Sequence, residues 1–296
     1  MNARNTEEFL ARARNELTEH YVYGHLAAHE KKPENRALLE KLSAQEKGHY
    51  EFWKSLLPGV EVKPRAFGRY GIPLLRGVFG VTFTTKFLEG HEKDSIETYE
   101  AMLPDLAPRE QERLKKIIED ERSHERSLLG QLTERRVGYV GFVALGLADA
   151  IVEITGVHAG FLGVTGSTLI AGVSGVIVGF AAAISMGSAA YLQAKQDPDK
   201  SPVVSAFITG ISYMVSVVCL ALPYFFIHTM ITAFSFSTCI GLVLLAAFTF
   251  YGSVLFDRKF AREFGESMFL MLGTALATYV LGTVVGKFFH LSSGSF

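Results

Sequence analysis

The sequence predicts an all-α protein, built as a four-helix bundle followed by a domain of five transmembrane helices. Charge is the first observation behind this prediction: residues 1–136 hold 23 of the 29 Lys and Arg and 23 of the 30 Asp and Glu. The second is that residues 137–296 consist mainly of five apolar runs, each at least as long as the roughly 20 residues with which a helix crosses a bilayer. We therefore expect two domains, 1–136 and 137–296. Neither contains a basic stripe with interleaved aromatic residues, so nucleic acid is not an expected partner.

Four amphipathic helices are predicted in the first domain from apolar side chains that recur every three or four residues. We expect them over about 6–31, from Pro33 to the Pro58-Gly59 pair, over about 78–102, and from Pro108 onwards. Proline suits the first turn of a helix, because the amide hydrogen that it lacks would have no partner there. The segment 60–77, rich in Gly and Pro, is the predicted connector between two helical hairpins.

A Glu-x-x-His motif occurs twice in these helices, as Glu46-Lys47-Gly48-His49 and as Glu121-Arg122-Ser123-His124. This spacing places a carboxylate and an imidazole on one helix face. Glu16 lies 30 residues before the first Glu of these motifs, and Glu89 lies 32 before the second. An acid and a histidine within an apolar stripe are costly unless something pairs with them, and carboxylates with one imidazole per metal suit iron or manganese. The doubled pattern predicts a carboxylate-bridged di-metal site.

His20 follows Glu16 by one helical turn on the same predicted face. Three interpretations stay open for it: an additional metal ligand, a hydrogen-bond donor behind the ligands, or a packed histidine without a role in the site.

The five apolar runs of the second domain cover about 139–163, 168–192, 203–227, 231–255 and 266–289. Lys and Arg precede the first run and follow the second and fourth, whereas the loops after the first and third contain neither. The positive-inside rule then places the first domain in the cytoplasm and the C-terminus outside. Close helix approach, within one chain or at a dimer seam, is predicted by three Gly-x-x-x-Gly motifs: Gly156 and Gly160, Gly175 and Gly179, Gly282 and Gly286.

Two acids lie one turn apart inside the first run, Asp149 and Glu153. Ionisable groups at membrane depth indicate a functional pathway, so we expect these carboxylates to bind a cation, a proton, or each in turn. The alternative is a neutral pair of carboxyl groups satisfied by neighbouring hydroxyls. Met186 in the second run offers a thioether for a transition metal or for packing. Glu263 and Glu266, at the cytoplasmic entrance to the fifth run, either collect cations or are solvated at the interface.

Residues 1–136 resemble a rubrerythrin-type ferritin-like domain, a family that adds a Glu three residues after the third-helix ligand, as Glu92 follows Glu89 here. The resemblance implies a di-iron site, with manganese or zinc as substitutes. The metal ligands that it implies are Glu16, Glu46, His49, Glu89, Glu92, Glu121 and His124.

Residues 139–289 resemble the vacuolar iron transporter family through Ala183-Ile184-Ser185-Met186-Gly187-Ser188-Ala189-Ala190-Tyr191 and through Gly146-Leu147-Ala148-Asp149-Ala150. That family has five spans, works as a dimer and exchanges divalent iron or manganese for protons. Two features depart from it: only 196–201 joins the second and third spans, where plant-type members carry a helical insertion, and the acid of the second span falls on Val178. Glu153 is our candidate for the missing carboxylate, and Tyr191 is an accessory candidate.

The combination of both domains resembles the membrane-bound ferritins, which implies a homodimeric exporter of Fe(II) or Mn(II) that exchanges protons across the inner (plasma) membrane of a prokaryote. Asp149, Glu153 and Met186 are the expected transport pathway. The alternative is a membrane-anchored di-iron ferroxidase or peroxidase, so a ferroxidase activity of the bundle stays open. Both cysteines, Cys219 and Cys239, lie in apolar runs and no Cys-x-x-Cys is present, so the chain has no rubredoxin-type centre to deliver electrons to a peroxidase.

Overall fold

The computed structural model describes residues 3–65, 71–72, 75–77, 79–89, 93–123 and 137–290. All regular secondary structure in these residues is helical, as the sequence predicts, and no strand occurs among them. The chain divides into two compact units, Met1–Glu134 and Arg135–Phe296, each described by itself below.

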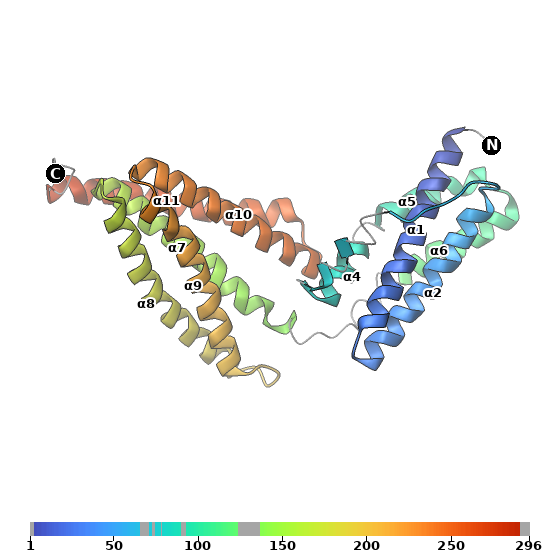
Figure 1. The fold of residues 1–296 in the computed structure, drawn as a ribbon, viewed down its shortest axis with the longest axis horizontal. Helices are drawn as coiled ribbons and strands as arrows, with labels where there is room; N and C mark the ends of the chain where they lie inside the picture. Colours follow the sequence, from blue (N-terminus) through green and yellow to red (C-terminus); the bar gives the residue numbers. More distant parts are fainter. Residues whose placement is uncertain are drawn as a thin grey trace. The chain divides into compact units, whose positions relative to one another are not determined.

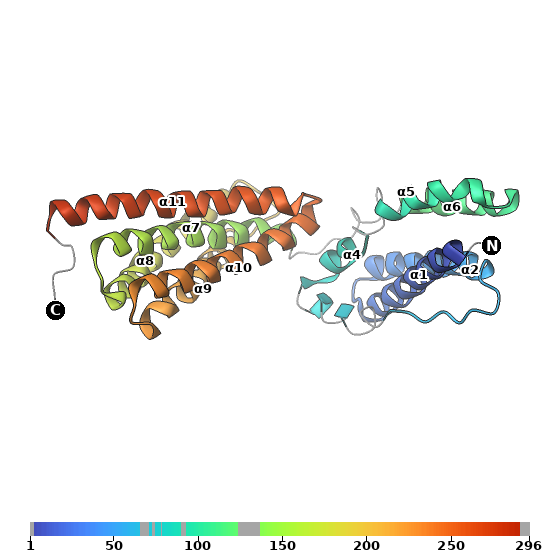
Figure 2. The ribbon, with the colours of Figure 1, turned by 90° about the horizontal axis from the view of Figure 1, so that it is seen from above.

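The first unit begins with a helical hairpin of α1 (Ala3–His29) and α2 (Pro33–Ser55) (Figure 1). The predicted role of Pro33 is confirmed, because it occupies the first turn of α2. A second hairpin pairs α5 (Lys93–Met102) with α6 (Pro108–Ser123), joined through the 3₁₀ turn η1 (Leu103–Asp105). Figure 2 shows this second hairpin lying alongside the first.

The predicted third helix, about 78–102, differs from the structure. Two helices stand in its place, α4 (Val81–Glu89) and α5, and residues 90–92 between them are outside the described part of the chain. Gly80 explains the later start of α4: its φ of 90° lies outside the range of a right-handed helix, so no helix continues through it.

Two apolar clusters form the interior of the first unit. One gathers side chains of α1, α2, α5 and α6, among them Phe9, Trp53 and Leu114. The other gathers side chains of α1, α2 and α4, among them Leu26 and Leu39. Along α1 and α2, the segment between these clusters holds Glu16, Glu46 and His49. The apolar packing on either side therefore fixes where these polar side chains lie.

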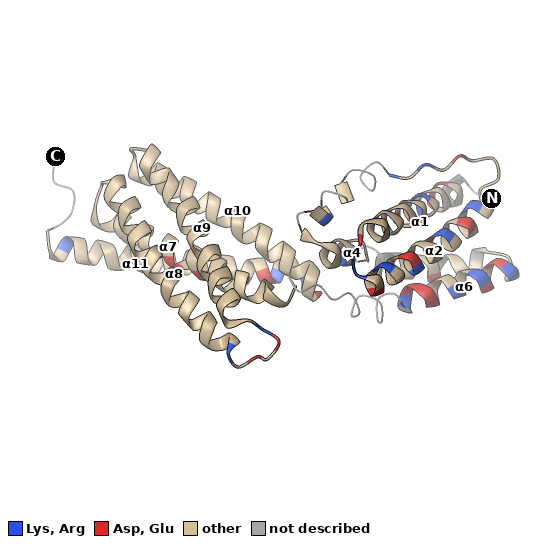
Figure 3. Ribbon diagram, turned by 60° about the horizontal axis from the view of Figure 1, so that its bottom comes forward, with Lys and Arg blue, Asp and Glu red and all other residues tan. Residues whose placement is uncertain are grey.

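The second unit contains five helices that are long and apolar enough to cross a membrane. Their large apolar side chains point outwards in many places, as lipid-facing residues do, and Figure 3 shows that charge is sparse among them. The helices are α7 (Val140–Val164), α8 (Thr168–Ala194), α9 (Pro202–Phe226), α10 (Met230–Phe256) and α11 (Phe260–Phe288).

Helix α7 is the centre of this unit, because it packs against each of the other four. Glycines make the close contacts. A Cβ built on Gly282 of α11 would lie 2.1 Å from the carbonyl oxygen of Gly160 on α7, and one on Gly179 of α8 would lie 2.5 Å from a methyl of Val217 on α9. The Gly-x-x-x-Gly motifs thus pack helices within one chain, which is the first of the two interpretations left open by the sequence.

Candidate metal centre

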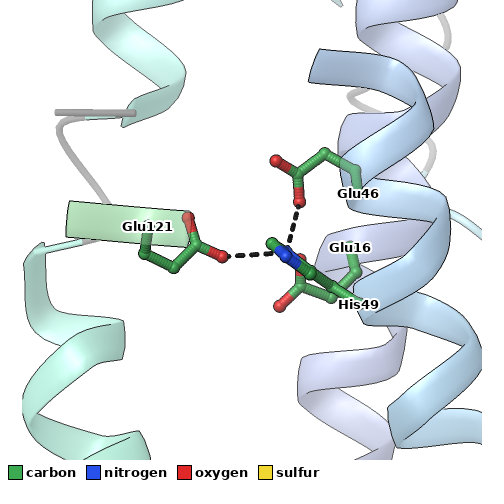
Figure 4. Close-up of side chains that lie close together, drawn as sticks. All are labelled: Glu16, Glu46, His49 and Glu121. Carbon is green, nitrogen blue, oxygen red and sulfur yellow. Dashed lines mark ion pairs between the residues drawn. The ribbon is translucent and has the colours of Figure 1, made fainter. Parts of the chain in front are cut away.

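Four buried residues come together in the first unit: Glu16 on α1, Glu46 and His49 on α2, and Glu121 on α6 (Figure 4). One ligand atom from each lies within 4.8 Å of the others. Each residue is at most 4% exposed. Figure 4 shows the Glu121 carboxylate reaching from one side toward His49, and Glu16 and Glu46 approaching it from the helices on the other.

The imidazole of His49 is surrounded by carboxylates. Its Nδ1 lies 3.0 Å from Glu121 Oε1, 3.3 Å from Glu46 Oε2 and 3.7 Å from Glu16 Oε2. Its Nε2 lies 3.6 Å from Asp120 Oδ2. Acidic oxygens therefore face both ring nitrogens, in a site from which water is largely excluded.

This arrangement shifts the protonation of its own members. Burial raises the pKa of Glu46 well above 4.5, and the negative charges of Glu121 and Glu16 raise it further. For His49, burial lowers the pKa, but the contacts with Glu121, Glu16 and Glu46 outweigh burial, so the net pKa is raised above 6.5. Protons on these groups therefore reduce the repulsion between the three buried carboxylates.

The donor set fits a divalent metal ion. Three carboxylates and one imidazole are oxygen and nitrogen ligands of the kind that iron, manganese and zinc accept, and a cation would neutralise the buried negative charge that protons now compensate. The predicted ligands Glu16, Glu46, His49 and Glu121 thus form a buried site able to hold a metal.

Three other predicted ligands lie where the structure does not describe the side chain. Glu89 ends α4, but its side chain is outside the described part, and Glu92 and His124 are outside it altogether. A second metal at this site therefore stays a prediction. His20 is not part of the cluster: its Nδ1 lies 2.8 Å from the carbonyl oxygen of Ser43 and 3.0 Å from the Ser43 hydroxyl.

Tyr99 is a site residue that the sequence prediction missed. Its hydroxyl donates a hydrogen bond of 2.5 Å to Glu16 Oε1, and its ring packs on Trp53 at 5.1 Å between centroids. Burial raises the pKa of Tyr99 well above 10, as do the charges of Glu16 and Glu121, so the phenol keeps its proton and acts as a donor. A partner of this kind orients a metal-binding carboxylate. The available signal was its place on the inner face of its helix.

Asp120 was missed as well, and no sequence pattern pointed to it. It precedes Glu121 on α6, its side chain is 32% exposed, and it reaches the His49 ring from the rim of the site.

In the second unit, Glu153 on α7 is positioned by Tyr213 of α9, whose hydroxyl donates a 2.5 Å hydrogen bond to Glu153 Oε2. Glu153 also lines a cavity of about 510 Å³ between α7, α8 and α11. Val178 of α8 lines the same cavity. Asp149 lies one turn before Glu153 and is half-buried, but it is not among the lining residues.

The remaining candidates of the second unit do not gather around Glu153. Met186 packs against the apolar core of the unit. Tyr191 lies in the groove between α8 and α9, with Lys195 Nζ 5.9 Å from its ring centroid. Two acids of α11 form ion pairs with nearby arginines: Glu263 with Arg258 at 3.5 Å and Glu266 with Arg262 at 2.8 Å.

No protein-family model matches the chain, and neither a curated protein nor a solved structure matches it. Two features of the residues themselves indicate a function. The first unit has a buried cluster of acids around one histidine, and the second has a carboxylate at a cavity among apolar helices.

Proposed function

We propose that this protein exports divalent iron or manganese from the cytoplasm in exchange for protons. The amino-terminal unit binds the metal at Glu16, Glu46, His49 and Glu121, and the membrane unit moves it. The observation that carries the proposal is the Glu153 carboxylate, which lines an open cavity between the apolar helices α7, α8 and α11 and belongs to the same chain as the buried acidic cluster. A helix that serves only as an anchor has no use for such a group.

In the amino-terminal unit, the cluster selects by charge and by ligand type. Hard oxygen donors and a single imidazole favour Fe(II), Mn(II) or Zn(II) over softer ions. Entry of the cation displaces the proton on His49, since a histidine ligand must be neutral. Tyr99 keeps its proton and continues to hold the Glu16 carboxylate in place. An iron ion bound there would supply one-electron chemistry toward dioxygen, and two ions would make the site a di-iron centre.

In the membrane unit, Glu153 holds the transported cation or a proton. Its hydrogen bond from Tyr213 fixes one carboxylate oxygen, and the side chain lines the cavity. Val178 cannot bind a cation, so Glu153 takes over the function of the second-span acid on the opposite wall. Asp149, one turn away, adds a second negative charge toward which a divalent ion is drawn.

The resemblance to membrane-bound ferritins supports the remaining parts of the proposal. We propose that this protein is a homodimer in the inner (plasma) membrane of a prokaryote, with its amino-terminal unit in the cytoplasm and its C-terminus outside. The alternation of Lys and Arg between the loops supports this orientation.

Metal flux in proteoliposomes tests the proposal. Purified wild-type protein is compared with Glu153→Gln, Asp149→Asn and Glu121→Ala, with Mn(II) or Fe(II) entry followed by a fluorescent chelator inside the vesicles. We expect flux in the wild type and its loss in Glu153→Gln. Loss in Glu121→Ala as well would place the cluster on the metal's route, and retained flux there would make the cluster a sensor. A wild type without metal flux would sink the transporter proposal.

A second candidate, a membrane-anchored ferroxidase, is favoured by one observation. Tyr99 connects Glu16 of the cluster to the ring of Trp53, and such aromatic side chains are suited to carry an electron away from a metal. Fe(II) oxidation by the purified protein, combined with no metal flux in vesicles, would select this candidate.

A further inference from the structure

A histidine lies buried in the membrane unit outside every site described above. His158 on α7 has no exposed surface, and it is the one histidine within α7–α11. Among the described residues, neither of its ring nitrogens has a hydrogen-bond partner, and it forms no ion pair. An unsatisfied polar group in such a place costs about 1–3 kcal/mol. Packing alone would be served better by an apolar side chain.

The neighbouring helices leave room for this ring. On α8, a Cβ built on Gly175 would lie 2.4 Å from His158 Nε2, so any larger residue there would displace the imidazole. On α9, the ring of Tyr224 lies 4.1 Å from that of His158 between centroids, tilted by 38°. The titratable group that faces the imidazole from α9 is thus the phenol of Tyr224, and Gly175 presents none from α8.

His158 and Glu153 lie against the same helix. Glu153 contacts Tyr213, and His158 contacts Tyr224, which follows 11 residues later on α9. Three helical turns take about 11 residues, so both tyrosines lie on one face of α9. His158 itself is five residues beyond Glu153 along α7, a rise of about 7.5 Å toward the carboxyl end of that helix. In the orientation proposed above, this is the outer half of the membrane.

We infer that His158 is the proton-carrying residue of the exchange, which takes up a proton from the outer side and delivers it to Glu153 as the metal ion leaves. This inference depends on the proposed function. The proton binds to a free ring nitrogen of His158 and then moves to the Glu153 carboxylate, which has just lost its cation. The next cation that arrives from the cytoplasm displaces this proton from Glu153 into the cytoplasm. An imidazole suits the task because a ring nitrogen without a hydrogen-bond partner can take up a proton and release it again.

Coupled transport in proteoliposomes tests this role with His158→Gln, which keeps a polar side chain but does not titrate near neutral pH. The matched control is His228→Gln, an exposed histidine between α9 and α10. We expect the wild type and the control to transport Mn(II) several-fold faster under an opposing pH gradient and to move protons against Mn(II). His158→Gln should keep Mn(II)/Mn(II) counterflow and lose the acceleration by the gradient.

The outcomes distinguish a failure of the proposed transport function from a failure of the proton role of His158. A wild type without metal flux overturns the proposed function, and the proton role with it. Flux in the wild type together with unchanged coupling in His158→Gln overturns the proton role alone. Metal flux without any proton movement in the wild type also overturns it.

A second measurement uses the wild-type protein and does not depend on the folding of a variant. Deuterium exchange at the imidazole C2 position, followed by mass spectrometry of the peptide containing His158, reports protonation of that single ring. We expect measurable exchange at His158 that slows when Mn(II) saturates the protein. No exchange over days at His158, while His228 exchanges, would show a sealed and permanently packed histidine and would refute the proposal.

Discussion

Replacement of Glu46 by glutamine should change the stability of the protein in opposite directions with and without metal. Glutamine has nearly the same shape but no charge. In the metal-free protein, burial and the charges of Glu121 and Glu16 raise the pKa of Glu46, so its ionisation destabilises the fold as pH rises above its unfolded value. Glu46→Gln removes this effect, and the metal-free variant should be the more stable protein at pH 7.

With metal the sign reverses, because Glu46 is one of three carboxylates in the site. Mn(II) at about 100 times its dissociation constant stabilises a folded protein by about 2.7 kcal/mol. Loss of a charged ligand that weakens binding about 100-fold would reduce this stabilisation to about 0.4 kcal/mol at the same concentration. The lost 2.3 kcal/mol or so corresponds to roughly 8 °C of the metal-induced shift in Tm for a unit of this size.

Tryptophan fluorescence during heating of the full-length protein in detergent is a selective assay. The chain has a single tryptophan, Trp53, which is fully buried on α2 one turn from His49. Its signal therefore follows the amino-terminal unit alone. Glu51→Gln, on the exposed side of the same helix, is the control for the change in net charge.

Three results would refute the reasoning. Equal Mn(II)-induced shifts in wild type and Glu46→Gln would remove Glu46 from the ligand set. A wild type that Mn(II) does not stabilise would remove the metal centre itself. A metal-free Glu46→Gln that melts below the wild type would show that the charge on Glu46 does not destabilise the cluster.

Three further predictions concern single contacts. Because the folded pKa of His49 is raised, the stabilisation that its protonated ring contributes is complete below about pH 6.5 and is lost as pH rises through the folded value. Mn(II) must displace this proton, so the affinity of the site for Mn(II) should rise by about tenfold per pH unit near pH 7. A pH-independent Mn(II) affinity in calorimetry would contradict this. Tyr99→Phe should weaken Mn(II) binding by about tenfold at unchanged folding, with the exposed Tyr21→Phe as control; equal affinities in calorimetry would remove the orienting role. Gly282→Ala places a Cβ 2.1 Å from a backbone oxygen, so it should destabilise the membrane unit by about 1–3 kcal/mol in denaturant titrations. Gly273→Ala on the same helix is the control, because a Cβ there meets open space and should leave the stability unchanged.

Local periodicity accounts for what the sequence predicts well. A Glu and a His three residues apart share a face on any helix, so Glu46 and His49 meet as soon as α2 forms. The matched interval from Glu16 to Glu46 requires only that two helices form a hairpin. Apolar runs likewise place the five membrane helices to within a few residues. The largest difference, the start of α11 at Phe260 where the apolar run begins near 266, arises because a helix can continue past its apolar part, here through the Arg262–Glu266 ion pair.

Contacts between helices account for what the sequence does not predict. Tyr99 has the position of a core residue, and only the packing of α5 against α1 brings its hydroxyl to Glu16. His158 follows Glu153 by five residues, which turns it about 140° away from the face that carries the two acids. Nothing in the local sequence shows that Gly175, 17 residues later on the next helix, leaves space for its ring.

The structure also distinguishes Asp149 from Glu153, two acids to which the sequence gives equivalent positions. Asp149 and Glu153 are equivalent on a helical wheel, one turn apart on α7. The cavity distinguishes them, since Glu153 lines it and accepts a hydrogen bond from Tyr213, whereas Asp149 does neither among the described residues. Val178 of α8 lines that cavity as well, so Glu153 supplies the carboxylate there and the facing position on α8 is apolar. In the proposed exchange, the Glu153 carboxylate at the cavity would be the site that the metal and the proton share, and His158, farther along the same helix, would be a second site for the proton alone.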